Sequence, residues 1–338
     1  MKGQRIVFVD ERVVEIEDYE VEAPSGHQVL VKTTASLISA GTETTMLALP
    51  LDSPRALTEV PWPAYPGYSN VGEVVEVGRN VDGFAPGDRV LTMGIHSTYT
   101  MLDLGGDRPD YIEKVPESIS DVSATFGILG SVAIHGFRNI STQIGDSCAV
   151  IGQGVVGQLV GQLARIGGCC PVIGVDLFSE RLESSRESGF DHVVDASSRD
   201  TEEAVMEITE GRGVDLGLEA TRNPATLKTL LKIGALGGNI VIVGSLPGTV
   251  DISLWTELQH KELSIHGIWQ PRAPIDGNHY YPWTQRRNRR VILDLIADGR
   301  LKVDHLVSHR PRIEEAAATY EMILRGGTDW MGIAFDWT

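Results

Sequence analysis

The chain is poor in cysteine and has no long apolar run. Only three cysteines occur among 338 residues, Cys148, Cys169 and Cys170. This odd number, within one apolar stretch, does not suggest a disulfide framework, so we expect reduced thiols and a cytoplasmic protein. There is no run of 18 apolar residues, and the charged N-terminus lacks the apolar core of a secretory signal. We therefore expect no membrane partner.

Basic residues are scarce relative to acidic ones. Lys and Arg total 29 against 46 for Asp and Glu, which gives a formal net charge of −17. Such a chain is a poor partner for the phosphate backbone of nucleic acids and for anionic bilayers. The charge argues against both partners, although it says nothing about the fold.

Glycine is abundant, with 37 residues, and the patterns between glycines divide the chain. A length of 338 residues suggests two domains at about 150 residues each. Residues 1–130 carry short alternating or apolar runs between Gly, Pro and Asp turns, which is typical of a β-rich domain. Over residues 131–270 strand-like runs alternate with helical segments, which predicts an α/β domain with a parallel sheet. We expect residues 271–338 to rejoin the first domain.

A glycine loop lies between a strand-like run and an apolar helical segment. Its residues, listed in order, are Gly152, Gln153, Gly154, Val155, Val156 and Gly157. In this G-x-G-x-x-G pattern the glycines allow a tight turn, close approach of the backbone to a pyrophosphate, and close packing of helix on strand. The following helix offers free N–H groups and its dipole. The loop predicts a dinucleotide site; the alternative is a glycine-rich turn of another α/β domain.

Asp176 ends the next strand-like run, 24 positions after Gly152. Its carboxylate is placed to accept hydrogen bonds from the adenosine ribose hydroxyls, and it would repel a 2′-phosphate. Leu177, rather than a basic residue, follows it directly. These features favour NAD over NADP as the cofactor, and the nearby Arg181 would soften that preference.

Several stretches together carry a family resemblance. They are Ala35–Glu43 (ASLISAGTE), Pro66–Gly78 (PGYSNVGEVVEVG), Gly87–Val90 (GDRV), the Gly152 loop with Asp176, Val214–Ala220 (VDLGLEA) and Gly238–Gly244 (GNIVIVG). Over essentially its whole length the chain resembles the medium-chain dehydrogenase/reductase superfamily of zinc-type alcohol dehydrogenase-like proteins.

The resemblance implies a GroES-like β-rich catalytic domain, a Rossmann domain with a doubly wound parallel sheet, and a C-terminal segment that returns to the catalytic domain. It also implies a homo-oligomer, often built by edge-to-edge pairing of Rossmann sheets. By the same resemblance the nicotinamide end of the cofactor would lie near Ala220, Thr221, Gly244, Ser245, Gly267 and Ile268.

The chain departs from the family at the metal positions. Where zinc-using members carry a catalytic Cys, it has Ser39; where they carry Gly-His-Glu, it has Gly67-Tyr68-Ser69; a further ligand position holds Gly130. No Cys precedes Cys148, so the lobe of four cysteines that holds a structural zinc is absent. Serine and tyrosine are poor zinc ligands at neutral pH. We therefore expect neither a catalytic nor a structural zinc.

The run S-A-G-T-E over residues 39–43 is similar to a subgroup that includes the bacteriochlorophyllide-modifying dehydrogenase and several sugar-modifying dehydrogenases. This narrower likeness rests on one short motif.

Oxidation of an alcohol without zinc needs a base for the hydroxyl proton and a donor for the developing alkoxide. Tyr68 matches the zinc-ligating His, so it is either the donor or a tyrosine that fills the metal pocket. Glu43 is either a buried base or an organiser of its loop, and Thr42 is the candidate relay hydroxyl. His96 has a suitable pKa for proton transfer, but it also fits a structural role; His135 is a weaker candidate.

An aromatic and basic segment follows residue 270. It contains Tyr280, Tyr281, Trp283, Arg286, Arg287, Arg289 and Arg290. Stacked aromatics with a guanidinium would bind a sugar ring that bears a carboxylate, phosphate or sulfonate; the alternative is a solvated helix start or a subunit contact. A helix over 284–297 would place Asn288, Ile292 and Leu295 on one face, with Arg290 pointing away.

These observations predict a zinc-independent, NAD-dependent oxidoreductase. It would transfer a hydride between nicotinamide and a secondary alcohol or ketone of a small polar substrate such as a sugar, polyol or cyclitol, with or without an anionic group. One alternative is a zinc-free enoyl or quinone reductase, against which Asp176 counts because those enzymes usually prefer NADPH. Others are a redox-neutral enzyme that uses bound NAD transiently for elimination or epimerisation, and a catalytically silent cofactor-binding subunit.

Overall fold

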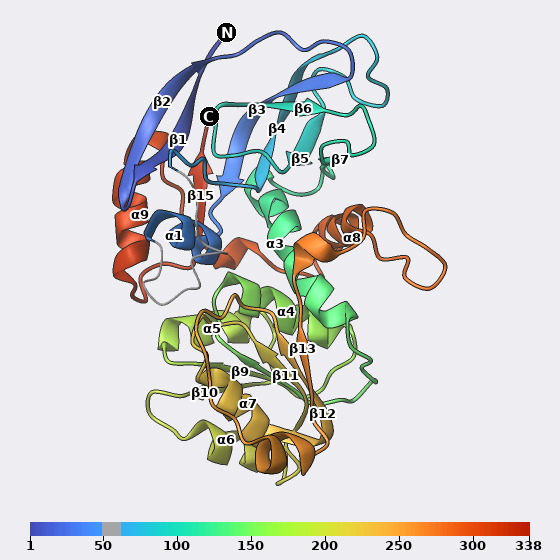
Figure 1. Ribbon diagram of the computed structural model, residues 1–338, viewed down its shortest axis with the longest axis vertical. Helices are drawn as coiled ribbons and strands as arrows, with labels where there is room; N and C mark the ends of the chain where they lie inside the picture. Colours follow the sequence, from blue (N-terminus) through green and yellow to red (C-terminus); the bar gives the residue numbers. More distant parts are fainter. Residues whose placement is uncertain (49–61) are drawn as a thin grey trace. The chain divides into compact units, whose positions relative to one another are not determined.

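The computed structural model describes residues 1–48 and 62–338, and the chain forms two compact units (Figure 1). The first unit comprises Met1–Leu129, Arg289–Gly299 and Val307–Thr338; the second comprises Gly130–Asn288 and Arg300–Leu306. The boundaries fall inside helices α3 (Asp121–Arg138) and α8 (Gln285–Ala297). Residues 271–288 therefore belong to the second unit, and the return to the first unit begins at Arg289 rather than at residue 271.

The first unit is β-rich. Strands β1 (Lys2–Asp10) and β2 (Val13–Glu20) form an antiparallel hairpin. A larger sheet has the order β14 (Val307–His309), β15 (Gly332–Asp336), β3 (Gln28–Leu37), β4 (Asn70–Val77), β5 (Arg89–Thr92) and β7 (Ile112–Lys114), with β6 (Tyr99–Asp103) on β3. The last strand of the chain, β15, pairs antiparallel with β3. This pairing incorporates the C-terminus into the first sheet.

Two helices pack against this β-rich unit, α1 (Ala40–Ala48) and α9 (Ala316–Arg325). The ring of Tyr320 on α9 contacts Phe8 of β1 edge-on, with centroids 5.0 Å apart. Phe335 of β15 and Leu47 of α1 lie in the same buried cluster. Burying such large side chains gives about 1.5–3 kcal/mol each, which holds the C-terminal helix on the N-terminal strands.

The second unit is an α/β domain. Its parallel sheet has the order β10 (His192–Asp195), β9 (Val172–Asp176), β8 (Cys148–Ile151), β11 (Val214–Glu219), β12 (Gly234–Ile242) and β13 (Ser264–Gly267). The connecting helices are α4 (Val155–Ile166), α5 (Ser179–Glu187), α6 (Thr201–Ile208) and α7 (Thr226–Ile233).

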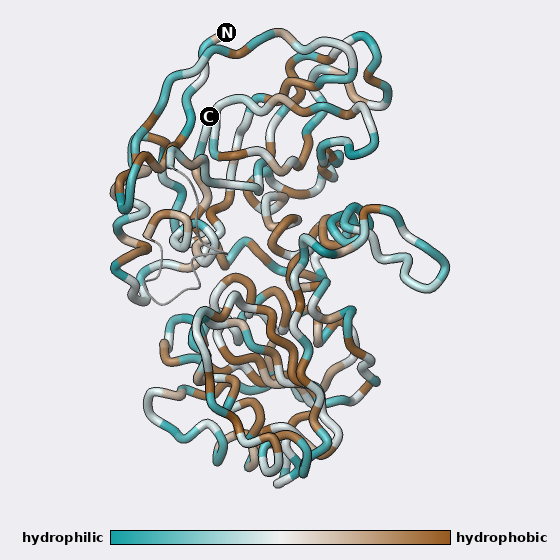
Figure 2. The backbone as a smooth tube through the Cα atoms, in the orientation of Figure 1, coloured by the Kyte–Doolittle hydropathy of each residue, from teal (hydrophilic) through white to brown (hydrophobic). Residues whose placement is uncertain are grey.

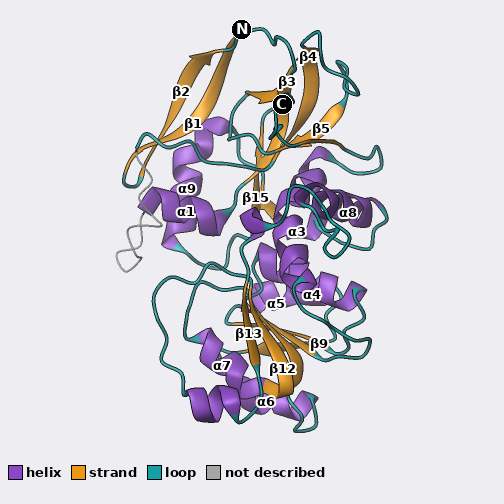
Figure 3. Ribbon diagram, turned by 45° about the vertical axis from the view of Figure 1, so that its right-hand side comes forward, coloured by secondary structure: helices purple, strands orange, loops and turns teal. Residues whose placement is uncertain are grey.

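The central strands of this sheet are apolar along their length, as Figure 2 shows, because helices cover them. Helices α6 and α7 contribute Val205, Leu230 and Leu231 to one buried cluster with the sheet residues Ile173 and Ile240, and Figure 3 shows both helices beside the sheet. The GroES-like plus Rossmann architecture expected from the sequence is confirmed. No helix in the described ranges is long and apolar enough to span a membrane.

Candidate functional site

The glycine loop joins β8 to α4, and its shape requires glycine at two positions. Gly152 has φ +95°, a region that side chains rarely adopt. A Cβ on Gly157 would lie 1.8 Å from the carbonyl oxygen of Gly152, so only glycine allows the helix to pack this close. A Cβ on Gly154, in contrast, would meet no atom within 4 Å. The space in front of Gly154 is therefore open to a ligand.

Helix α4 begins directly behind this open space. Gly154 is its N-cap residue, and no side chain caps the helix. The first N–H groups of a helix have no acceptor within the helix, and the helix dipole adds a partial positive charge there. Gly154, Val155 and Val156 are each partly exposed. The loop therefore has the geometry of a pyrophosphate cradle.

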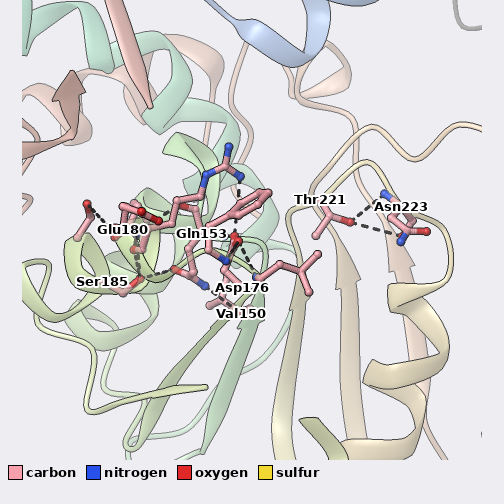
Figure 4. Close-up of polar contacts among 12 residues, drawn as sticks. Val150, Gln153, Asp176, Glu180, Ser185, Thr221 and Asn223 are labelled. Atoms are coloured by element: carbon pink, nitrogen blue, oxygen red, sulfur yellow. Dashed lines mark hydrogen bonds and ion pairs between the residues drawn. The ribbon is translucent and has the colours of Figure 1, made fainter. Parts of the chain in front are cut away.

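Asp176 lies at the end of β9, beside the loop (Figure 4). Its carboxylate accepts hydrogen bonds from the backbone N–H groups of Gln153 at 2.6 Å and of Leu177 at 2.8 Å. Arg181 Nη1 is 3.9 Å from the same carboxylate. The structure thus brings Asp176, Leu177 and Arg181 together with the glycine loop, as the sequence predicts.

Gln153 has a different role from the rest of the loop. Its side chain is fully buried. The amide Nε2 donates to the carbonyl of Val150 at 2.7 Å, and the amide Oε1 accepts from the hydroxyl of Ser185 on α5 at 3.0 Å (Figure 4). Its backbone N–H is engaged by Asp176. Gln153 therefore fixes the loop to α5, and none of these groups remains for a cofactor.

The other predicted cofactor positions follow the carboxyl ends of neighbouring strands. The register places Ile151 of β8 opposite Val175 and Glu219, and Glu219 opposite Ile242, which pairs with Gly267. Ligands of open α/β sheets bind at this edge, where the strand order reverses. The residues placed there are Ala220, Thr221, Gly244, Ser245, Gly267 and Ile268.

Glu219 is a buried carboxyl group at this edge that the sequence analysis does not single out. Its Oε1 accepts from the backbone N–H of Thr221 at 2.7 Å and from the hydroxyl of Thr226 at 3.2 Å. Burial raises the pKa of Glu219, and the hydrogen bonds from Thr221 oppose that rise. The sequence does contain a signal for this residue, because Glu219 lies in an otherwise apolar strand. A carboxyl group buried there needs hydrogen-bond donors such as those of Thr221 and Thr226.

In the first unit three hydroxyl groups form a chain. The phenol of Tyr68 donates to Ser39 Oγ, and the Ser39 hydroxyl in turn donates to Thr42 Oγ1 at 3.3 Å. Tyr68 and Ser39 are largely enclosed, whereas Thr42 is exposed. Burial raises the pKa of Tyr68, and the charge of Glu43 raises it further, against the effect of the hydrogen bonds to Ser39 and Thr42. The phenol is therefore neutral and able to donate a hydrogen bond.

Glu43 lies beneath this chain, with no exposed surface. Its Oε1 accepts from the backbone N–H of Ser39 at 2.7 Å, and its Oε2 accepts from the hydroxyl of Tyr320 and lies 3.1 Å from His96 Nε2. A buried carboxylate is tolerated when several donors surround it. Glu43 thus holds the start of α1 in place and adds a negative charge near Tyr68.

His96 is also fully buried, and both ring nitrogens are engaged. Its Nδ1 lies 2.8 Å from Ser36 Oγ, which itself accepts from Trp337 Nε1 at 2.8 Å. Ser36 can therefore donate to Nδ1, which leaves the proton on Nε2 directed at Glu43. Both ring nitrogens of His96 are therefore engaged by protein groups, and neither remains for a substrate.

The residues around Tyr68 do not fit a zinc ion. The described part of the chain contains no group of three or more His, Cys, Asp or Glu that could hold a metal. The side chains that surround the phenol oxygen are the hydroxyls of Ser39 and Thr42, which are poor zinc ligands.

The aromatic and basic segment leads into helix α8, close to the predicted bounds. Asn288, Ile292 and Leu295 are buried, while Arg290 is exposed and pairs with Glu113 and Asp294. In the second unit, Trp283 contacts the guanidinium groups of both Arg138 and Arg287. His135, on α3, lies in the same unit, whereas Tyr68 belongs to the first unit.

Comparison with known proteins agrees with this architecture. Residues 25–135 match the family model "Alcohol dehydrogenase GroES-like domain", and residues 155–283 match "Zinc-binding dehydrogenase". An L-threonine 3-dehydrogenase of Escherichia fergusonii is 30% identical over 236 residues, 62% of this chain and 68% of the relative. The chain belongs to the medium-chain dehydrogenase/reductase superfamily, with zinc-type alcohol dehydrogenase-like domains. It is an oxidoreductase of the dehydrogenase type that uses a nicotinamide cofactor.

Two further proteins illustrate the relationship. A sorbitol dehydrogenase of Bacillus subtilis is 28% identical over 286 residues, which covers 77% of each chain. The crystal structure of 2R,3R-butanediol dehydrogenase from Bacillus subtilis superposes with a TM-score of 0.82 at 23% identity and covers 99% of both chains. The family prediction is confirmed, and the structural likeness supports the fold.

Proposed function

We propose that the protein is a zinc-independent, NAD-dependent dehydrogenase that interconverts a secondary alcohol and a ketone on a small polar substrate, a sugar, polyol or cyclitol. The observation that carries this proposal is the hydroxyl chain Tyr68–Ser39–Thr42, in which Tyr68 and Ser39 stand where the family resemblance implies metal ligands. The named activities of relatives, sorbitol, butanediol and L-threonine dehydrogenation, support a secondary alcohol as the reacting group.

The cofactor assignment rests on the second unit. The glycine loop and the start of α4 would hold the pyrophosphate, and Asp176 would accept from the ribose hydroxyls. The carboxylate disfavours a 2′-phosphate, and the neighbouring Arg181 faces that same carboxylate at 3.9 Å. Gly244, Ser245, Gly267 and Ile268 are proposed for the nicotinamide end. The Asp176 carboxylate at the ribose therefore favours NAD over NADP.

When bound, the oxidised nicotinamide accepts a hydride from the substrate carbon. We assign the accompanying proton to the hydroxyl chain: the substrate hydroxyl gives its proton to Tyr68 as the phenol proton passes to Ser39. Ser39 passes its own proton to Thr42, which is exposed and can release one to water. The reverse sequence supplies the proton for ketone reduction. Glu43 keeps the phenol protonated between turnovers, because its charge raises the pKa of Tyr68 in addition to burial.

We also propose a cytoplasmic homo-oligomer. The three cysteines are free thiols, and two of them are buried. Strand β13 is an end strand of the described sheet, so its edge is open to pairing. We propose that a second copy of the chain pairs there, at β13 and the run 238–245.

A substrate screen with purified protein tests the proposed function. NAD mixed with a panel of polyols, sugars and cyclitols is expected to produce the absorbance of the reduced cofactor, with NADP giving a much weaker signal. Activity only with NADPH and an enone or quinone would replace the proposal by a reductase. Conversion of a substrate without net cofactor reduction would indicate transient use of NAD, and binding without any turnover would indicate a silent subunit.

A further inference from the structure

The second unit contains a cavity of about 380 Å³ at the carboxyl end of β13. Its lining includes His135 and Asn139 from the end of α3, Ile268 and Trp269 after the strand, and Arg272 and Tyr281 from the following segment. No carboxylate lines it. Its size falls in the range of small-molecule sites, and its lining combines apolar surface with a few polar groups, as such sites do.

Two further guanidinium groups pack on Trp283, in the same segment as the cavity-lining Tyr281. The carbon centres of the Arg138 and Arg287 guanidinium groups lie 3.3 Å and 4.0 Å from the ring centroid of Trp283. Trp283 is two residues from Tyr281, which lines the cavity. The Tyr281 hydroxyl and Arg138 Nη1 are both buried without a hydrogen-bond partner among the described residues. One indole therefore gathers two like charges, while Arg272 of the cavity lining lies over the ring of Trp269, 5.4 Å from its centroid.

This arrangement is unfavourable without a counter-ion. Burial, together with the charge of Arg287, lowers the pKa of Arg138 to about 10, although Tyr281 acts in the opposite direction. No described carboxylate forms an ion pair with Arg138, Arg272 or Arg287. Arg138 and Arg287 share one indole without an acidic partner, so a bound anion would offset their repulsion.

We propose that this cavity, defined by His135, Asn139, Ile268, Trp269, Arg272 and Tyr281, binds the phosphate ester group of a small ligand. Arg272 in the lining and the Arg138–Arg287 pair on Trp283 together favour a dianion over a single carboxylate, and a planar guanidinium pairs with phosphate through two parallel hydrogen bonds. The apolar surface of Ile268 and Trp269 would contact the carbon part of the ligand. Because Gly267 and Ile268 of this lining are also proposed for the nicotinamide end, we infer that the ligand is a phosphorylated polyol substrate bound beside the nicotinamide. That identification, unlike the anion site itself, rests on the proposed function.

Titration calorimetry with inorganic phosphate tests the anion site. The wild-type protein is expected to bind phosphate, and Arg272→Gln and Arg287→Gln each weaken binding about tenfold or more, the loss of one charge-assisted hydrogen bond. Both side chains are exposed, so folding should survive. The matched control is Arg186→Gln, an exposed arginine on α5 that pairs with Glu183; it should bind phosphate as the wild type does. Absence of phosphate binding, or equal loss in the control, overturns the proposal.

A second measurement separates the ester from free phosphate. With NAD, sorbitol and its monophosphate are compared as substrates of the wild type and of Arg272→Gln. We expect a lower KM for the phosphate ester in the wild type, and a rise of about tenfold in that KM alone in the variant. Equal KM values for both substrates would overturn the assignment of a phosphorylated polyol as the substrate. Turnover of unphosphorylated polyols without phosphate binding would overturn this inference and leave the proposed function standing. Phosphate binding without turnover of any substrate would overturn the proposed function and leave the anion site standing.

Discussion

Replacing Tyr68 by Phe should lower kcat by about 10²–10⁴ while NAD binding stays unchanged, because removing a proton-transfer group typically has this effect. The substitution deletes one oxygen, the donor to Ser39, and breaks the chain that leads to the exposed Thr42. The ring remains to fill the space. Steady-state kinetics with the best substrate of the screen, together with calorimetry of NAD binding, measures both effects.

Tyr65→Phe is the matched control. Tyr65 lies three residues away, and its hydroxyl accepts from Arg5 outside the hydroxyl chain. This variant should keep kcat within about threefold of the wild type, far from the loss expected of an acid–base group. If Tyr68→Phe behaves like Tyr65→Phe, the phenol only fills the pocket and the proton path runs elsewhere.

The second large effect is expected at the glycine loop, where two glycines should respond in opposite ways. Gly154→Ala should fold with unchanged stability, because its Cβ meets no atom within 4 Å and its φ of −72° suits alanine. The added methyl would enter the space assigned to the pyrophosphate, so the Kd for NAD should rise about 10–100-fold, the equivalent of one or two lost hydrogen bonds to a charged group.

Gly157→Ala should instead lower stability. Its Cβ would lie 1.8 Å from the Gly152 carbonyl oxygen, and the neighbouring atoms are backbone that cannot easily shift. Overpacking of this kind costs about 1–3 kcal/mol, which corresponds to a fall of roughly 2–12 °C in Tm for a domain of this size. Thermal unfolding and calorimetry of both variants separate the two roles. Normal NAD binding by Gly154→Ala would show that the dinucleotide does not contact this loop.

The features that the sequence predicts well are those encoded locally. The glycine loop, its helix and Asp176 lie within one stretch of 25 residues, so their spacing alone defines the strand–turn–helix unit. The alternation of strands and helices after residue 131 predicts the parallel sheet for the same reason. Helix α8 follows its periodicity, and Asn288, Ile292 and Leu295, which are expected on one face, are all buried.

The surroundings of Glu43 could not be predicted in this way, because they depend on contacts between distant parts of the chain. Tyr320 reaches Glu43 across 277 positions, and Trp337 reaches Ser36 across 301. The pairing of β15 with β3 brings Trp337 to Ser36, and the packing of α9 against α1 brings Tyr320 to Glu43. The sequence alone is consistent with either a catalytic or a structural role for Glu43 and His96. The hydrogen bonds that engage both side chains favour positioning roles.

The most direct test of the central claim measures turnover against zinc content. Purified protein is dialysed against a strong chelator, analysed for metals, and assayed with NAD and its substrate before and after zinc is added back. We expect less than about 0.1 zinc per chain, unchanged turnover after chelation, and no gain on addition of zinc, since hydroxyl groups replace the usual Cys and His ligands. About one zinc retained per chain, or activity that returns only with zinc, would contradict it.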